Sequence, residues 1–220
     1  MKLKKEIEFG GRKLILETGH LAKQASGSCV VTYGETMLLV AATSSKGHEE
    51  DRGFFPLSVE YREKYYASGK IPGGFFKREA RPTEKEILSS RLTDRPLRPL
   101  FAEGFNNETR LDINVISYDE VNEPDVFAAL GASFALSLSD IPFNGPIASV
   151  RVGRVNDELI MNPTKEQMLE SDYDLVLSGS KESIVMVEGK CEFVSEDDVL
   201  MAIQYGHEGI KELVQLQEDL

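Results

Sequence analysis

The feature that most constrains the fold is a cluster of chain-breaking residues, Ile141-Pro142-Phe143-Asn144-Gly145-Pro146. Two prolines and a glycine this close together exclude a continuous helix or a central strand, so regular structure stops here. On both sides, short runs rich in β-branched residues alternate with runs of helical periodicity, which is typical of an α+β fold. We therefore predict two lobes, residues 1–145 and residues 146–220, each a small sheet with helices on one side.

Turn-forming residues between apolar runs predict the strands. Gly10-Gly11, Tyr33-Gly34-Glu35 and Asn156-Asp157 each separate two such runs, and each of these pairs predicts a hairpin. Alternating or largely apolar runs predict the remaining strands at 57–65, 111–118, 175–180, 183–188 and 191–194.

A capping box predicts the first long helix. Thr83 and Glu86 have the Thr-x-x-Glu spacing in which each side chain bonds to the backbone N–H of the other residue. Pro96 is expected to kink or end this helix near Arg95, because proline lacks an N–H donor and its ring clashes with the preceding turn. The apolar residues in between predict the buried face: Ile87, Leu88 and Leu92.

Three further helices are predicted. The range 123–138 begins with a proline flanked by two acidic residues, which suits a helix N-terminus. A short helix is predicted at 165–170, and Ser195 with the acidic residues after it begins the last one. Gly206 and Gly209 are expected to weaken the middle of this last helix.

A basic segment, residues 69–98, interrupts an acidic chain. It carries eight of the 25 Lys and Arg residues and four of the 37 Asp and Glu residues, a net charge of +4 in a protein whose total is −12. Concentrated positive charge of this kind indicates a polyanionic partner. Pro72-Gly73-Gly74 then keeps two aromatics on a loop, so at least one of them is expected to be exposed. Aromatic faces beside cations suit single-stranded nucleic acid, and the loop offers four such residues: Phe75, Phe76, Lys77 and Arg78.

The same segment ends with a row of arginines. Arg91, Arg95 and Arg98 follow at spacings of four and three residues, so a helix would place all three on one face. Guanidinium groups this close repel one another unless an anion lies among them, and phosphate matches their geometry. Ordinary structural interpretations stay open: an aromatic pair is more often part of a core, and such arginines often pair with carboxylates elsewhere.

Composition and isolated residues restrict the class of protein. No apolar run approaches the length of a membrane span, and the first residues lack a signal-peptide pattern. Cys29 and Cys191 form no metal-binding motif and suit a reducing compartment. The histidines are widely separated and are interpreted as packing or surface residues: His20, His48 and His207. We therefore expect a cytoplasmic protein with no metal site of its own.

Four uninterrupted strings carry a specific resemblance: residues 51–57, 69–82, 91–101 and 131–147. They resemble the first ribonuclease PH-type repeat of the bacterial polynucleotide phosphorylase family, and the similarity runs from about Leu14 to the last helix. The resemblance implies the ribonuclease PH-like fold, with the β-α-β architecture of ribosomal protein S5 domain 2.

The resemblance also implies a reaction and the residues that serve it. The reaction is phosphorolysis, in which inorganic phosphate attacks the last phosphodiester of RNA while magnesium and arginines stabilise the developing charge. The family grips incoming RNA with an aromatic–basic loop, which corresponds here to Phe75, Phe76, Lys77 and Arg78, with Arg81 as a further cation. The first repeat contributes arginines toward the composite active site of the second repeat, and these correspond to Arg91, Arg95 and Arg98.

Two parts of the family's catalytic equipment are missing from the sequence. The phosphate-binding loop before the long helix is replaced by residues 121–125, whose carboxylates would repel phosphate and whose Pro124 lacks an N–H donor. Of the metal-binding set, Asp174 is present, but Met168 and Val176 replace the other aspartate and the lysine. The resemblance therefore implies a catalytically degenerate repeat, with inorganic phosphate as co-substrate and magnesium bound by the second repeat.

The implied partners are single-stranded RNA, the second repeat of the same protein and two further copies in a homotrimer, with no membrane. Two alternatives remain. The chain could be a stand-alone ribonuclease PH-like phosphorolytic enzyme, or an acidic scaffold protein whose arginines only form ion pairs. Arg151 is a weaker candidate for the site, since it can point to solvent from a strand.

Overall fold

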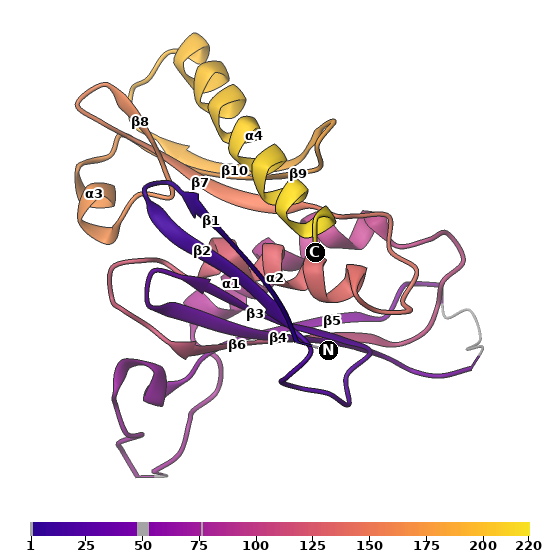
Figure 1. Ribbon diagram of the computed structural model, residues 1–220. Coiled ribbons are helices and arrows are strands. Elements are labelled where there is room, and N and C mark those ends of the chain that lie inside the picture. The colour runs from indigo at the N-terminus through magenta and orange to yellow at the C-terminus, as the bar shows by residue number, and fades with distance from the viewer. Residues whose placement is uncertain (1, 48–52, 76) are drawn as a thin grey trace.

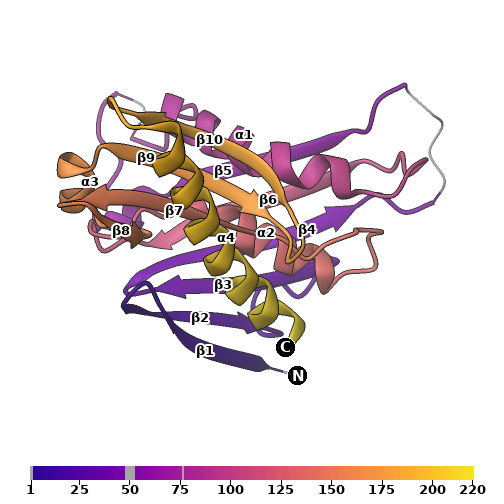
Figure 2. The same ribbon diagram turned by 90° about the horizontal axis from the view of Figure 1, so that it is seen from above.

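The computed structural model describes residues 2–47, 53–75 and 77–220. They form two β-sheets with two helices between them and a long helix over the second sheet (Figure 1 and, from above, Figure 2). This arrangement confirms the predicted α+β class. Within the described ranges, no helix is long and apolar enough to cross a membrane.

The first sheet has six strands in the order β1-β2-β3-β4-β6-β5, and β5 and β6 are its only parallel pair. Its first two hairpins are those predicted, and Gly10 and Gly34 adopt the left-handed conformation, with φ of 54° and 60°, that their turns require. The strands are β1 (Leu3–Phe9), β2 (Arg12–Thr18), β3 (Gly27–Tyr33), β4 (Thr36–Ser44), β5 (Leu57–Glu63) and β6 (Thr109–Ser117).

Helices α1 (Glu84–Leu97) and α2 (Asp125–Ser137) cover one face of this sheet (Figure 1). The α2 helix lies between the two sheets and contacts β3, β4 and β7, so that it is buried on every side from Asp125 to Leu136. Gly131 permits the close approach, because a Cβ atom there would lie 2.7 Å from Val40 Cγ2.

The capping box of α1 is confirmed, but its predicted buried face is wrong at two of its three residues: only Leu92 packs, partly buried, against the core. Ile87 and Leu88 are exposed, and the buried residues are Glu86, Ser89, Thr93, Pro96 and Leu97. The reason is that α1 packs against β5, an edge strand whose outer N–H groups have no strand partner. Polar side chains of α1 satisfy them instead: Ser90 Oγ accepts from the Tyr61 N–H at 3.0 Å and Glu86 Oε1 accepts from the Glu63 N–H at 2.9 Å.

The α1 helix ends close to Pro96, two residues beyond Arg95, where the prediction placed a kink or an end near Asp94 and Arg95. The helix continues to Leu97 and passes into a 3₁₀ turn, η2 (Arg98–Leu100). Proline removes a single hydrogen bond in the last turn, and both Pro96 and Leu97 are buried, so tertiary packing holds the turn in place.

The second sheet has the order β10-β9-β7-β8 and is antiparallel throughout. The strand predicted at 183–188 is β10, which continues to Cys191. The separate strand predicted at 191–194 is wrong: after Cys191 the chain bends, and Phe193 has a positive φ of 52°. The elements after residue 147 are β7 (Ala148–Val155), β8 (Glu158–Met161), α3 (Lys165–Glu170), β9 (Tyr173–Gly179), β10 (Ile184–Cys191) and α4 (Glu196–Glu218).

The α4 helix lies diagonally across the second sheet, on the side away from α2 (Figures 1 and 2). The glycines expected to weaken it instead allow it to pack closely. A Cβ atom at Gly206 would lie 2.3 Å from Leu177 Cδ1, and the helix runs unbroken from Glu196 to Glu218.

One hydrophobic core joins the two sheets. It includes Leu38 and Val40 of the first sheet, Val150 and Leu177 of the second, and Phe127 of α2 between them. Among the residues that the structure describes, strands β1 to β6 lie before the 141–146 cluster and strands β7 to β10 lie after it. The division into lobes at residues 145 and 146 stays a prediction, because this shared core gives each sheet contacts with the other.

Candidate nucleic-acid interface

The loop that carries the aromatic–basic motif is fastened to the protein at its base. The chain leaves β5 through a 3₁₀ helix, η1 (Tyr65–Ser68), and returns to α1. The Glu79 carboxylate accepts hydrogen bonds from Lys64 Nζ at 3.0 Å and from the Tyr65 N–H at 3.3 Å. Beside it, the Arg62 guanidinium donates to the Ala80 carbonyl at 2.8 Å. The outgoing and returning segments are therefore tied together, and the loop extends away from both sheets (Figure 1).

The tip of this loop is open to solvent. Phe75 is 95% exposed, which confirms the expectation that at least one aromatic of the motif is exposed. Lys77 is exposed and, within the described residues, makes no hydrogen bond or ion pair; Arg78 is exposed as well. Phe76 lies outside the described residues. The RNA-binding role of these side chains stays a prediction.

The three arginines of α1 and η2 are not equivalent. Arg98 is held by the protein itself: it donates to both Asp94 carboxylate oxygens, at 2.7 and 3.0 Å, and to backbone carbonyls at the start of β5. Arg95 pairs with Glu188 of β10. Arg91 has no hydrogen bond or ion pair among the residues that the structure describes, and the same holds for Arg81 in the loop. The predicted row therefore contains one uncommitted cation, Arg91.

A groove of about 620 Å³ separates α1 from the second sheet, and Arg91 and Arg95 form part of its wall. Arg98 lies outside its lining. Charges of both signs face the groove, so it is not uniformly basic. The cations are Lys85, Arg91, Arg95, Arg151 and Lys190, and the carboxylates are Glu84, Asp125, Asp174 and Glu188.

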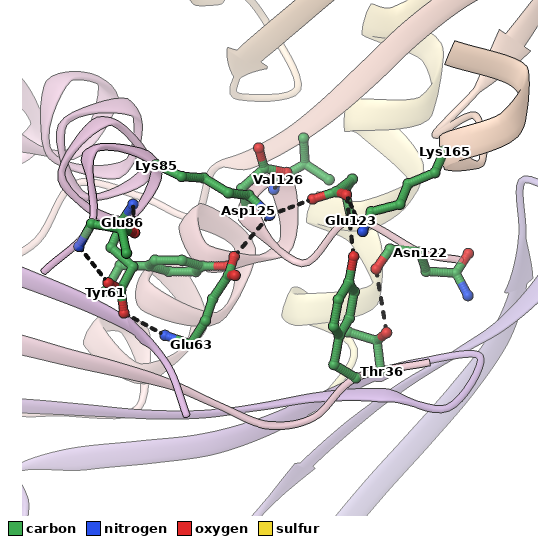
Figure 3. Close-up of polar contacts among 12 residues, drawn as sticks. Thr36, Tyr61, Glu63, Lys85, Glu86, Asn122, Glu123, Asp125, Val126 and Lys165 are labelled. Carbon is green, nitrogen blue, oxygen red and sulfur yellow. Dashed lines mark hydrogen bonds and ion pairs between the residues drawn. The ribbon is translucent and has the colours of Figure 1, made fainter. Parts of the chain in front are cut away.

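The N-terminus of α2, where the resemblance predicted a lost phosphate cradle, is filled by side chains of the protein (Figure 3). The Glu123 carboxylate lies between two lysines: Lys85 Nζ donates to one oxygen at 2.8 Å, and Lys165 Nζ lies 3.2 Å from the other. Tyr118 Oη donates to the second oxygen, also at 3.2 Å. Lys85 further pairs with Glu63 at 3.0 Å.

This cluster is electrostatically satisfied. Burial by itself would raise the pKa of Glu123, but the hydrogen bond and charge of Lys85, followed by those of Lys165, hold that pKa below its ordinary value. Burial would likewise lower the pKa of Lys85, and its two carboxylate partners raise it instead. Both groups are charged at neutral pH, so an incoming phosphate would meet a carboxylate where it needs donors.

Arg151 occupies the space between two carboxylates. Its side chain is 13% exposed, with Nη2 3.0 Å from Asp125 Oδ2 and Nε 2.9 Å from Asp174 Oδ1. The interpretation that Arg151 points to solvent is therefore wrong. Magnesium needs several oxygen ligands in octahedral geometry, and a guanidinium seated on both carboxylates does not fit such an ion. Elsewhere in the described part of the chain, no group of three or more His, Cys, Asp or Glu is arranged to hold a metal.

Sequence reasoning missed the lysines that bind Glu123 and the pairing of Arg151. Lys85 is 38 residues from Glu123, and Arg151 is 26 residues from Asp125. No local spacing links such partners. The clearest signal in the sequence was the pair of acidic residues on either side of Pro124. Their charge at a helix start indicated that phosphate would be repelled, but it did not reveal the cations that neutralise these two carboxylates.

Two domain models of one protein family match the chain. Residues 10–142 match the model of the 3′ exoribonuclease family, domain 1, and residues 145–209 match that of domain 2. The chain is 53% identical over its whole length to the polyribonucleotide nucleotidyltransferase of Geotalea uraniireducens, and 57% identical over 98% of its length to that of Gemmatimonas aurantiaca. It spans 32% and 29% of those relatives and corresponds to an N-terminal part of them.

The fold has a distant counterpart among solved structures. The crystal structure of rice (Oryza sativa) Rrp46 superposes with a TM-score of 0.71, covering 98% of this chain and 93% of that one at 16% identity. A likeness at this identity shows the fold alone. Together with the two matched domains, which span most of the residues that build both sheets, it confirms the ribonuclease PH-like fold, and the chain belongs to the 3′ exoribonuclease family.

Proposed function

We propose that this chain is the first, catalytically degenerate ribonuclease PH-type repeat of a polyribonucleotide nucleotidyltransferase, a phosphate-dependent 3′-to-5′ exoribonuclease that releases nucleoside diphosphates. In the whole protein the repeat binds single-stranded RNA in the cytoplasm, contributes arginines toward the composite active site of the second repeat, and takes part in a homotrimer. Magnesium and phosphate bind at the second repeat.

The observation that carries this proposal is a contrast between two sets of charged groups. Lys77, Arg81 and Arg91 are exposed and uncommitted within the described residues, as phosphate-binding cations need to be. The charged side chains at the start of α2 form ion pairs within the protein, and the Glu123 carboxylate lies where a phosphate would need hydrogen-bond donors. Binding of RNA is thus supported, and phosphorolysis by this chain alone is not.

Among the three arginines, Arg91 is the strongest candidate for a direct contact across the composite site. Arg95 would first have to leave Glu188. Arg98 already bonds to Asp94 and to carbonyls of the chain, so its role is to brace the end of α1 rather than to reach RNA.

Incubating the chain with poly(A), inorganic phosphate and magnesium tests the degenerate character. We expect no release of nucleoside diphosphate above the blank. Sustained phosphate-dependent release by the purified chain would contradict the proposal and favour a stand-alone phosphorolytic enzyme.

The same preparation tests RNA binding. Its affinity for single-stranded RNA should fall linearly with salt on a log–log plot, and Lys77→Ala with Arg78→Ala should reduce the slope by roughly one per lost phosphate contact. Lys4→Ala with Lys23→Ala removes the same charge from a different part of the surface and should leave the slope nearly unchanged. Equal slopes for both double variants would show that the loop does not bind RNA.

A further inference from the structure

A pocket lies at the base of the aromatic–basic loop, apart from its tip. Its volume is about 210 Å³, and it is enclosed by the end of β5, the η1 helix and the segment that returns to α1. We name it the base pocket. Its lining residues that matter here are Arg62, Lys64, Tyr65, Lys70, Glu79 and Arg81.

Charges inside the base pocket do not cancel. Lys64 is neutralised by Glu79 at 3.0 Å, and Arg62 lies 3.7 Å from Glu86. The third carboxylate, Glu63, pairs at 3.0 Å with Lys85, which lies outside the pocket. Every carboxylate of the lining is thus paired.

Two cations are left over. Arg81 has no hydrogen bond or ion pair within the described residues. Among the same residues, Lys70 pairs only with Glu120, which lies outside the pocket; the two side chains are 3.8 Å apart and 67% and 65% exposed, so this pair is weak and Lys70 can turn to an anion in the pocket. A guanidinium and an ammonium that line the same small pocket can bind a single phosphate group.

An aromatic side chain lies beside these cations. Tyr65 lines the pocket and is 42% exposed, because η1 fixes its backbone while its ring is not covered. Its neighbour Tyr66 is more exposed, at 59%, but does not line the pocket. A half-covered ring next to a phosphate site can stack on a base without the cost of becoming ordered.

We propose that the base pocket is a second subsite for single-stranded RNA, in which Arg81 and Lys70 bind one backbone phosphate and Tyr65 stacks on the adjoining base. This inference rests on the proposed RNA-binding function and extends it from the loop tip to the loop base. The pocket accommodates one sugar–phosphate unit, and the base lies outside on the ring, so the site recognises backbone and stacking rather than base identity. An acidic peptide would satisfy the two cations but would make no use of the ring.

The test compares matched variants in the binding of a fluorescent oligoadenylate, followed by anisotropy over a range of salt concentrations. Tyr65→Leu should weaken binding about fivefold or more, since stacking on one base contributes about 1–3 kcal/mol, whereas Tyr66→Leu should change it little. Arg81→Gln should lower the log–log salt slope by about one. Lys23→Gln should not, although Lys23 is also an exposed cation with no hydrogen bond or ion pair among the residues that the structure describes. All four side chains are exposed, so thermal unfolding should be unchanged.

The outcomes separate the two proposals. In one outcome the wild-type chain binds RNA, this binding depends on Lys77 and Arg78, and the Tyr65 and Arg81 variants bind as their controls do. The base pocket is then not a subsite, and the proposed function stands. If the wild-type chain does not bind RNA at all, both fall. If poly-glutamate displaces the oligoadenylate as effectively as poly(A) does, the assignment to RNA is overturned.

Discussion

Glu123 shows how a single side chain determines the chemistry available at the start of α2. Helix N-termini attract anions, because their first backbone N–H groups have no partners within the helix and the helix dipole is positive there. In this chain the anion is built into the sequence, and Lys85 and Lys165 hold it in place. The lysines are fully engaged as a result.

The Glu123 cluster should make stability depend on pH. Because the folded-state pKa of Glu123 lies below its ordinary value of 4.5, its stabilisation is fully present above that value and is lost as pH falls through the lower, folded-state pKa. At neutral pH, Glu123→Gln should lower the free energy of unfolding by roughly 1.5–3 kcal/mol, the usual contribution of hydrogen bonds to a charged group. Urea unfolding of both proteins at several pH values measures the difference.

Glu103→Gln is the control, since Glu103 is exposed and has no hydrogen bond or ion pair in the described part of the chain. Its stability should track the wild type at every pH. The difference in free energy of unfolding between the wild type and Glu123→Gln should shrink as the pH falls. A difference that stays constant down to the acid transition would show that the lysines do not lower the pKa of Glu123.

At the scale of elements, α1 joins the sheet through polar contacts rather than an apolar stripe. Glu86 alone accepts the N–H of Glu63 through one carboxylate oxygen and the N–H of Thr83 through the other. It therefore both caps the helix and closes the edge of the first sheet, which protects β5 from pairing with another chain.

Truncating Glu86 should be costly for that reason. Glu86→Ala leaves two backbone donors without partners and should lower the free energy of unfolding by about 2–3 kcal/mol. Glu84 is exposed and lies two residues earlier in the same first turn. Glu84→Ala should therefore lower the free energy of unfolding by only a few tenths of a kcal/mol, through the helix dipole. Chemical denaturation measures both variants. If Glu86→Ala and Glu84→Ala lost the same free energy of unfolding, the edge strand β5 would not depend on the hydrogen bonds of α1.

Across the whole molecule, α4 is tied to the junction between the two sheets by a buried polar network. Gln217 Nε2 donates to the Ile147 carbonyl at 2.8 Å, and Ser133 Oγ of α2 donates to Gln217 Oε1 at 3.0 Å. The Ile147 N–H in turn donates to Ser133 Oγ at 2.8 Å. The last helix, the central helix and the first residue before β7 therefore share one set of hydrogen bonds.

This connection predicts cooperative unfolding. Gln217→Ala should reduce stability by about 1–3 kcal/mol, because Ser133 and Ile147 lose buried partners, and calorimetry should still show one transition. Glu212→Ala, on the exposed side of the same helix, should be nearly neutral. Two separated transitions, with only the later part of the chain affected, would show that the sheets unfold independently.

Much of the fold follows from local sequence rules. Local causes predict the three hairpins, the capping box at Thr83 and the helix at 123–138. These causes are turn geometry, an N-terminal hydroxyl and a proline with acidic neighbours at a helix start. The exposed tip of the aromatic–basic loop is predicted in the same way, since Pro72, Gly73 and Gly74 prevent regular structure.

Only the tertiary structure decided three features of this protein. They are which residues of α1 are buried, the bonding of Arg98 to Asp94 and to carbonyls near β5, and the neutralisation of Glu123, Asp125 and Asp174. Each depends on a partner brought close by folding, such as Lys85 or Arg151, or on an edge strand in need of acceptors. The sequence by itself determined which charges this protein carries and where its chain turns. Packing alone decided which of those charges remain free, because electrostatic pairing depends on distance in space and not on separation along the chain.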